Sequence, residues 1–203
     1  MLNKVYLHVG LHKTGSSAIQ KAIREYDDGV TATAVFDVEN HSIPMFTIFS
    51  DSKYTYPQWT KRGWSKQDID EQAEAYELVL RKNLMRSDIE NLIITGEDIS
   101  GLHPHEKHNL IAYLQNFTKK IKVIVYVRNP LDFVVSNSQE YIKSARPPVV
   151  VGPTFRNKIV PFLEILPRDD ITVISYDSLV EKKISVIQDF QIQVNSKQLI
   201  QEV

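Results

Sequence analysis

Short runs of apolar, mostly β-branched residues recur along the chain, and longer stretches of mixed apolar and polar residues separate them. Such near-continuous runs are typical of strands that are buried on both faces of a parallel sheet. The predicted strands are Val5–Val9, Ala32–Val38, Leu92–Thr95, Val123–Val127 and Ile171–Ser175. The predicted helices are Ser16–Tyr26, Lys66–Arg86, Pro104–Lys119, Pro130–Lys143, Thr154–Leu166 and Ser178–Phe190.

This alternation predicts a three-layer α/β fold, in which helices cover both faces of a central, mainly parallel β-sheet. The chain has no internal repeat and no linker, so we interpret residues 1–203 as a single domain. Two segments lie outside the alternation. Residues 40–64 are rich in aromatic and turn residues, and Ser144–Pro153 is interrupted by prolines, so both are predicted to be loops that could line a site.

The composition excludes several kinds of chemistry. The chain has no cysteine, which excludes disulfides, a thiolate nucleophile and any Cys-ligated metal. Its 24 Lys and Arg against 25 Asp and Glu give a net charge of −1, which argues against an extended nucleic-acid surface but allows a local basic pocket. No apolar run approaches the roughly 18 residues of a membrane helix, and the first residues do not form a signal peptide. We therefore expect a cytoplasmic protein without membrane contact.

A segment with two glycines and a lysine follows the first predicted strand. Residues 9–17 read VGLHKTGSS and lead into a helix. Glycines permit a tight turn and a close backbone approach, and a helix N-terminus offers N–H groups and a positive dipole end. The segment therefore predicts a phosphate or sulfate site. Its candidate donors are the Lys13 ammonium, the backbone at Gly15 and the hydroxyls of Thr14, Ser16 and Ser17.

The position of the lysine distinguishes this loop from that of nucleotide triphosphatases. There the lysine follows the second glycine and precedes the hydroxyl that binds Mg²⁺. Here Lys13 precedes Gly15, and that Lys-Ser/Thr pair is absent. The pattern G-x-x-K-T-G-[ST]-[ST] after the first strand resembles the 5′-phosphosulfate loop of the sulfotransferase family. The resemblance implies a P-loop NTPase-like fold that binds 3′-phosphoadenosine 5′-phosphosulfate (PAPS) without a metal ion.

A second segment tests this resemblance independently. Residues 123–136 read VIVYVRNPLDFVVS, a buried strand that ends at Arg128 and a helix that Asn129 is expected to cap. An arginine at the strand end with a serine eight positions later resembles the family's 3′-phosphate signature. The resemblance implies that Arg128 and Ser136 hold the 3′-phosphate of PAPS. Further along, the pair Tyr176 and Asp177 is interpreted as a ring packed on the sheet and a helix cap.

Sulfuryl transfer to a hydroxyl or amine needs a stabilised leaving phosphate and a base for the acceptor proton. Lys13 fits the first role. For the base, Glu97 follows the third predicted strand in LIITGEDIS, and Thr-Gly-Glu resembles the Ser-Ser-Glu of many bacterial sulfotransferases. His12 and His103 are alternative proton acceptors. His103, His105 and His108 lie close in sequence, but we expect no metal, because His105 and His108 could simply share a helix face.

The acceptor remains open, and a small molecule or a glycan is expected. Aromatic and cationic side chains in residues 40–64 could bind a sugar ring or an acidic acceptor, or the rings could form a small satellite core. We interpret the protein as a PAPS-dependent sulfotransferase. The alternatives are a P-loop kinase that uses ATP and Mg²⁺, and a binding protein that keeps the fold without turnover. The oligomeric state is not readable from these patterns.

Overall fold

The computed structural model describes residues 1–11, 13–143 and 154–197. Within these residues five strands form one parallel sheet in the order β2-β3-β1-β4-β5. The strands are β1 (Lys4–Val9), β2 (Thr31–Thr33), β3 (Asn91–Gly96), β4 (Ile121–Val127) and β5 (Ile171–Ser175). Val9 pairs with Gly96, so β1 and β3 end at the same height on one edge of the sheet. The predicted α/β fold with a parallel central sheet is confirmed.

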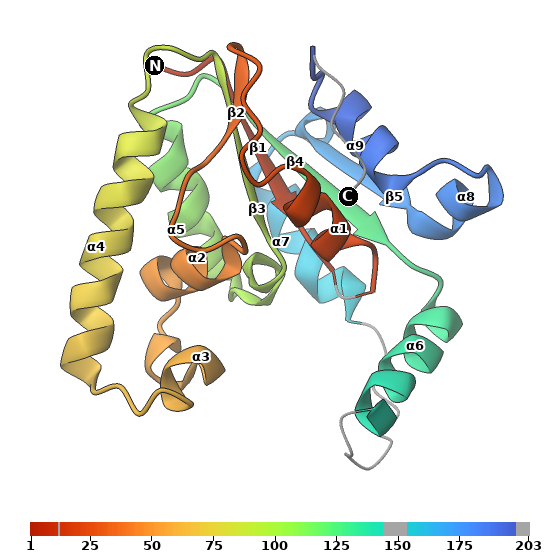
Figure 1. The fold of residues 1–203 in the computed structure, drawn as a ribbon, viewed down its shortest axis with the longest axis horizontal. Coiled ribbons are helices and arrows are strands. Elements are labelled where there is room, and N and C mark those ends of the chain that lie inside the picture. The colour runs from red at the N-terminus through yellow and green to blue at the C-terminus, as the bar shows by residue number, and fades with distance from the viewer. Residues whose placement is uncertain (12, 144–153, 198–203) are drawn as a thin grey trace.

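Helices cover both faces of the sheet (Figure 1). The helices on one face are α2 (Ser42–Phe49), α4 (Lys66–Leu84), α5 (Pro104–Gln115) and α7 (Phe155–Ile165). Those on the other face are α1 (Ser16–Ala22), α8 (Tyr176–Glu181) and α9 (Val186–Gln193). The short helix α3 (Pro57–Thr60) lies beside α2 and α4. The 3-10 turns of the described residues are η1 (Lys53–Thr55), η2 (Asp98–Gly101) and η3 (Arg168–Asp170).

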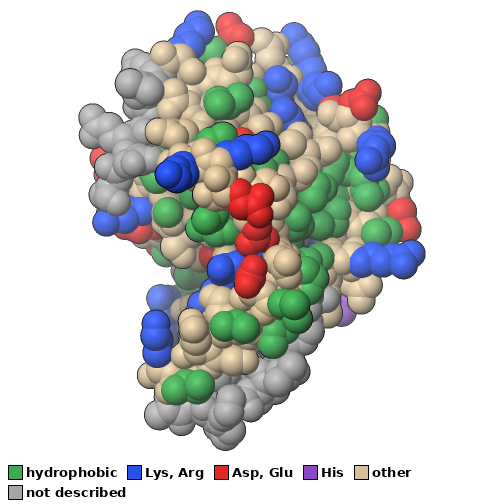
Figure 2. Space-filling view, turned by 90° about the vertical axis from the view of Figure 1, so that its right-hand side faces the viewer, with side chains coloured by type: hydrophobic (Ala, Val, Ile, Leu, Met, Phe, Trp, Pro, Cys, Tyr) green, Lys and Arg blue, Asp and Glu red, His purple; other side chains and the backbone are tan. Residues whose placement is uncertain are grey.

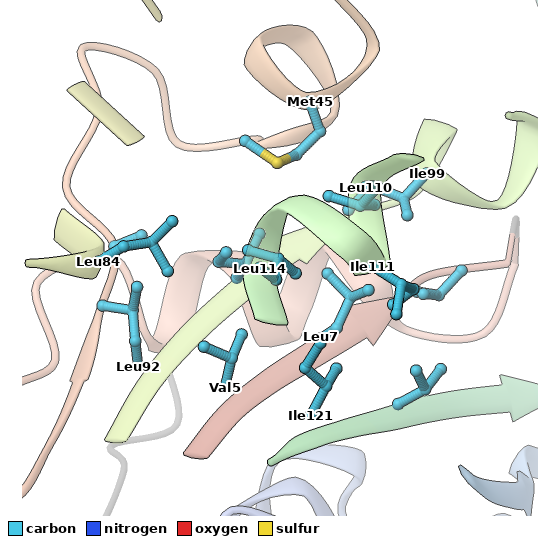
Figure 3. Close-up of a cluster of buried hydrophobic side chains, with 14 of the residues drawn as sticks. Val5, Leu7, Met45, Leu84, Leu92, Ile99, Leu110, Ile111, Leu114 and Ile121 are labelled. Carbon is cyan, nitrogen blue, oxygen red and sulfur yellow. The ribbon is translucent and has the colours of Figure 1, made fainter. Parts of the chain in front are cut away.

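The sheet separates two hydrophobic cores. Along β1, Val5 and Leu7 point to the face of α5, where Leu110 and Leu114 pack (Figure 3). Val9 belongs to the same cluster. The alternate residues of β1 point to the opposite face, where α1 and α9 pack. Because successive side chains of a strand point to opposite faces, a strand covered on both sides is mostly apolar. This is why the strands read as continuous hydrophobic runs.

The helix α6 (Pro130–Lys143) follows β4 and extends away from the sheet (Figure 1). The Leu131 N–H donates to Asn129 Oδ1 at 2.9 Å, which confirms the predicted cap. Leu131, Val135 and Ile142 are exposed on this helix, and Figure 2 shows hydrophobic side chains over the same part of the surface. No helix in the described part of the chain combines the length and apolar character needed to cross a membrane.

Residues 40–64 were predicted to be a loop, and this prediction is wrong. The structure has α2, η1 and α3 there, and their aromatic rings pack together. Trp59 is fully buried and stacks on Trp64 with ring centroids 4.6 Å apart, and Tyr56 stacks on Phe46 at the same distance. The satellite core, which was one of the two interpretations, therefore accounts for most of these rings.

Two other element predictions also need correction. The second strand ends at Thr33 rather than Val38, because the Val35 N–H donates to the Asn83 side chain on α4 and the chain leaves the sheet. The last predicted helix is divided into α8 and α9, with Lys183 in the left-handed region at φ 55° between them. Ser175 and Ser185 cap these two helices, so the predicted helix cap from Asp177 is wrong.

Candidate functional site

The loop between β1 and α1 has an unusual backbone. Lys13 has φ 67° and Gly15 has φ 80°, so both lie in the left-handed region. For a residue with a side chain this conformation costs roughly 1–2 kcal/mol. The Gly10 N–H donates to the Gly96 carbonyl at 3.2 Å, which fixes the start of the loop to the end of β3. The loop therefore holds a strained turn at the point where the sheet ends and a helix begins, which is a common setting for anion sites.

The hydroxyl groups of this loop divide into two kinds. The buried Thr14 hydroxyl donates to the Leu11 carbonyl at 2.6 Å, and the buried Ser16 hydroxyl donates to the same carbonyl at 3.4 Å. Both stabilise the turn itself in this structure. Ser17 is exposed in the first turn of α1, and Lys13 is partly exposed. Contact of these groups with an anion stays a prediction.

The loop lies directly against the residue that follows β3. A Cβ added at Gly10 would be 2.5 Å from Ser16 Oγ and 2.9 Å from Glu97 Cγ. Glu97 is the N-cap residue of η2, and its neighbour in sequence, Gly96, pairs with Val9 of β1. The structure therefore brings the Glu97 side chain beside the loop, as its position after the third strand suggested, while its role as a base stays a prediction.

Arg128 follows the last residue of β4 and reaches the same loop. Its Nη1 donates to the Lys13 carbonyl at 3.4 Å, and its guanidinium carbon lies 5.7 Å from the centre of the Tyr176 ring. The Tyr176 ring in turn lies 3.2 Å from the position of a Cβ at Gly15. Asp177 Oδ1 is 3.7 Å from Arg128 Nε, and Asp177 Oδ2 accepts the Asn129 N–H. Asp177 therefore orients the arginine.

The Arg128 side chain keeps a donor available. Its Nε is buried and has no hydrogen-bond partner within the described residues, because the 3.7 Å to Asp177 is too long for one. A buried donor without a partner is costly unless something else accepts its hydrogen bond. The donor set at this edge, a guanidinium beside a lysine-containing loop, fits a phosphate group.

Among the described residues, Ser136 makes no hydrogen bond with Arg128 or with the loop. It lies on α6, which extends away from the sheet, and its hydroxyl makes no hydrogen bond with any residue in the described ranges. The pairing of Ser136 with Arg128 on one phosphate stays a prediction. Of the alternative bases, His12 lies outside the described residues. His103 lies at the start of α5 and stacks on His105 with ring centroids 6.0 Å apart.

Two lysines that the sequence interpretation missed lie around the end of β3. Lys107 is buried on α5, and its Nζ donates to the carbonyls of Ser100 (3.0 Å) and Leu102, so it holds the η2 turn. Burial lowers the pKa of Lys107 to about 8. Burial also lowers the pKa of Lys158 on α7, an effect that the nearby Asp98 and Glu97 carboxylates oppose.

A hydrogen-bonded pair ties the aromatic core to the same turn. The Tyr56 hydroxyl donates to Asp98 Oδ2 at 2.6 Å, and the Asp98 N–H donates to Ser42 Oγ at 2.9 Å. Burial, followed by the Asp98 carboxylate, raises the pKa of Tyr56 well above that of an exposed tyrosine. Asp98, the residue next to Glu97, is thus held by hydrogen bonds to Ser42, the first residue of α2, and to Tyr56, the N-cap residue of α3.

Comparison with known proteins adds the fold class. No family model matches the chain, and no curated protein matches it either. Among solved structures, the chain is similar to a sulfotransferase from Alicyclobacillus acidocaldarius, with TM-score 0.58 and 12% identity over 100% of this chain and 85% of that one. It is also similar to the sulfotransferase domain of the Synechococcus PCC 7002 olefin synthase, with TM-score 0.53 and 11% identity over 96% of this chain and 74% of that one.

Because these identities are low, the likeness establishes the fold alone. The chain is an α/β protein whose five-stranded parallel sheet is flanked by helices. More particularly, its fold is the one found in sulfotransferases.

Proposed function

We propose that this protein is a PAPS-dependent sulfotransferase that moves a sulfuryl group to a hydroxyl or amine acceptor. The observation that carries the proposal is the meeting of three groups at one edge of the sheet: the strained Lys13–Gly15 turn, Glu97 against Gly10, and Arg128 on the Lys13 carbonyl. The fold shared with sulfotransferases supports the same reading. In open α/β sheets, ligands bind at this carboxyl edge of the strands.

In this proposal the loop binds the 5′-phosphosulfate of PAPS. The N–H groups at Gly15, Ser16 and Ser17 and the positive end of α1 face the anion, and Lys13 adds a full charge. Arg128, oriented by Asp177, donates its unpaired Nε–H and its Nη groups to the 3′-phosphate. Ser136 is proposed to complete this phosphate site.

The proposed transfer step needs one base and one cation. Glu97 takes the proton from the acceptor hydroxyl or amine as the acceptor atom forms its bond to sulfur. The bond between sulfur and the bridging oxygen of the 5′-phosphate breaks, and that oxygen keeps the electron pair. Lys13 stabilises the charge that develops on this leaving phosphate. The step balances without a metal ion.

The acceptor is proposed to be a small molecule or a glycan, with a carbohydrate as one candidate. Trp59 and Tyr56 are buried in the aromatic core, so they are not an open platform for it. Trp64 is partly exposed, and Arg62 lies 5.4 Å from its ring centre. These two side chains are one part of this region that could still contact a sugar.

Calorimetry with 3′-phosphoadenosine 5′-phosphate (PAP), the product nucleotide, tests the proposed site. We expect a dissociation constant on the order of micromolar for the wild type. Lys13→Ala or Arg128→Ala should weaken it by roughly 10- to 100-fold, since each removes a charge-assisted contact of about 1.5–3 kcal/mol.

Lys21→Ala is the matched control, because Lys21 is exposed in the last turn of α1, at the opposite end of the helix from the loop. It should bind PAP as the wild type does. ATP with Mg²⁺ should bind more weakly than PAP. No PAP binding by the wild type, or tighter binding of ATP with Mg²⁺, would overturn the proposal.

A further inference from the structure

A second cluster of ligating side chains lies at the N-terminal end of α5, apart from the phosphate loop. Asp51 directly follows the α2 C-cap, and His105 and Glu106 lie in the first turn of α5. Their nearest ligating atoms, one from each residue, all lie within 4.8 Å of one another. His105 Nε2 is 2.8 Å from Asp51 Oδ2, and both side chains are largely exposed, at 60% and 80%.

Glu106 is the buried member of this cluster, and hydrogen bonds fix the orientation of its carboxylate. It is 1% exposed, and its Oε1 accepts the Ser50 hydroxyl at 3.2 Å and the Asp51 N–H at 2.7 Å. Its Oε2 accepts the His103 N–H at 2.7 Å. A carboxylate has about four acceptor positions, so Glu106 retains one while its orientation is held by three hydrogen bonds. Carboxylates that bind metal ions are commonly oriented by such hydrogen bonds from neighbouring groups.

The geometry points to a surface site for a divalent transition metal ion, with Zn²⁺ as the typical occupant, bound by Asp51, His105 and Glu106. One imidazole nitrogen and two carboxylate oxygens are a ligand set that Zn²⁺ accepts, with water in the remaining position. Zinc ligands lie about 2.0–2.2 Å from the ion, so the exposed Asp51 and His105 side chains must move inward by small rotations. The ion then takes the place of the hydrogen bond between these two side chains, and the neutral His105 imidazole binds it through Nε2 while its proton is on Nδ1.

The site selects its metal through the histidine. Mg²⁺ and Ca²⁺ prefer oxygen ligands only, whereas imidazole suits Zn²⁺, Co²⁺ and Ni²⁺. The bound ion also joins residues that are 54 positions apart in the chain. Since a clip that closes a long loop restricts the unfolded chain, binding should raise the thermal unfolding temperature.

Isothermal titration with Zn²⁺ tests this site in the full chain. We expect one ion per chain with a dissociation constant on the order of micromolar, and weaker binding of Mg²⁺. His105→Ala and Asp51→Asn should weaken Zn²⁺ binding by at least about tenfold and remove the rise in unfolding temperature. These variants change exposed side chains, so they keep the fold that a change at the buried Glu106 would endanger.

His108→Ala is the matched control, because His108 is exposed on the same helix and outside the cluster. It should bind Zn²⁺ as the wild type does, and imidazole NMR signals should shift for His105 and not for His108. The inference is overturned if the wild type gives no binding heat, or if His105→Ala binds as tightly as the wild type. None of these readouts depends on PAPS, so the outcome is separate from that of the proposed function.

Discussion

Gly15 should be the most sensitive single position of the phosphate loop. Its φ of 80° lies in the left-handed region, and an added Cβ would be 3.0 Å from Val186 Cγ1 and 3.2 Å from Tyr176 Cε2. Gly15→Ala therefore strains the backbone and displaces the Tyr176 ring that lies beside Arg128. Gly29 provides a matched control, because its φ is 76° but nothing lies within 4 Å of its added Cβ.

Both substitutions lower the free energy of unfolding through backbone strain, and Gly15→Ala also lowers it through overpacking. A left-handed alanine costs roughly 1–2 kcal/mol, and this applies to both positions. Overpacking a tight contact costs about 1–3 kcal/mol more, and this applies to Gly15 alone. We therefore expect losses in the free energy of unfolding of about 2–5 kcal/mol for Gly15→Ala and about 1–2 kcal/mol for Gly29→Ala. Both variants should remain folded if the wild type has ordinary stability.

Urea denaturation measures the stability loss, and calorimetry with PAP measures the effect on the site. Gly15→Ala should lose most of its PAP affinity, since the loop and the Tyr176–Arg128 contact both shift. Gly29→Ala should bind PAP like the wild type despite its lower stability. The reasoning is refuted if Gly15→Ala keeps wild-type PAP affinity, or if Gly29→Ala loses as much affinity as Gly15→Ala.

Two further predictions concern the residues that hold the end of β3. Burial lowers the pKa of Lys107 from 10.5 to about 8, so between these pH values the unfolded chain binds more protons than the folded one. The free energy of unfolding should therefore rise by about 3 kcal/mol from pH 8 to 10.5, and urea titrations of Lys107→Met should lack this rise. Tyr56→Phe removes the 2.6 Å hydrogen bond to Asp98 and should cost about 1–3 kcal/mol by urea denaturation, because it leaves a part-buried carboxylate with one partner fewer. The control is Tyr54→Phe, because the Tyr54 hydroxyl donates to Asp70 and both residues are partly exposed. It should cost less than about 1 kcal/mol. Equal losses in the free energy of unfolding for the two substitutions would contradict this account.

The parts of the fold that depend on local sequence could be predicted. Strands buried on both faces are continuous apolar runs, and these runs gave the parallel sheet. The β2 strand was overestimated because its end is set by Asn83, which lies 48 residues from Val35. The segment 40–64 was misinterpreted because Pro44 and Pro57 read as loop residues, yet both lie in the first turn of a helix, where proline is tolerated.

The candidate site also has parts that local sequence predicts and parts that depend on residues far apart in the chain. The turn at Lys13 and Gly15 was readable because glycine spacing after a strand is local information. The positions of Tyr176 over Gly15 and of Asp177 at Arg128 depend on how β5 and β4 lie side by side, which no short motif encodes. Lys107 did leave a signal, because it stands with Leu110, Ile111 and Leu114 on the buried face of α5, where a lysine is unusual.

The central claim is that Glu97 and the Lys13 loop form a sulfuryl-transfer site. Its most direct test is transfer of radiolabelled sulfate from PAPS to a panel of carbohydrates, phenols and amines, with Glu97→Gln compared against Glu90→Gln. Glu90 precedes β3 at the opposite edge of the sheet and is exposed. We expect transfer by the wild type and by Glu90→Gln, and a rate about 10²- to 10⁴-fold lower for Glu97→Gln at unchanged PAP affinity. No transfer by the wild type to any acceptor, or an undiminished rate for Glu97→Gln, would contradict the claim.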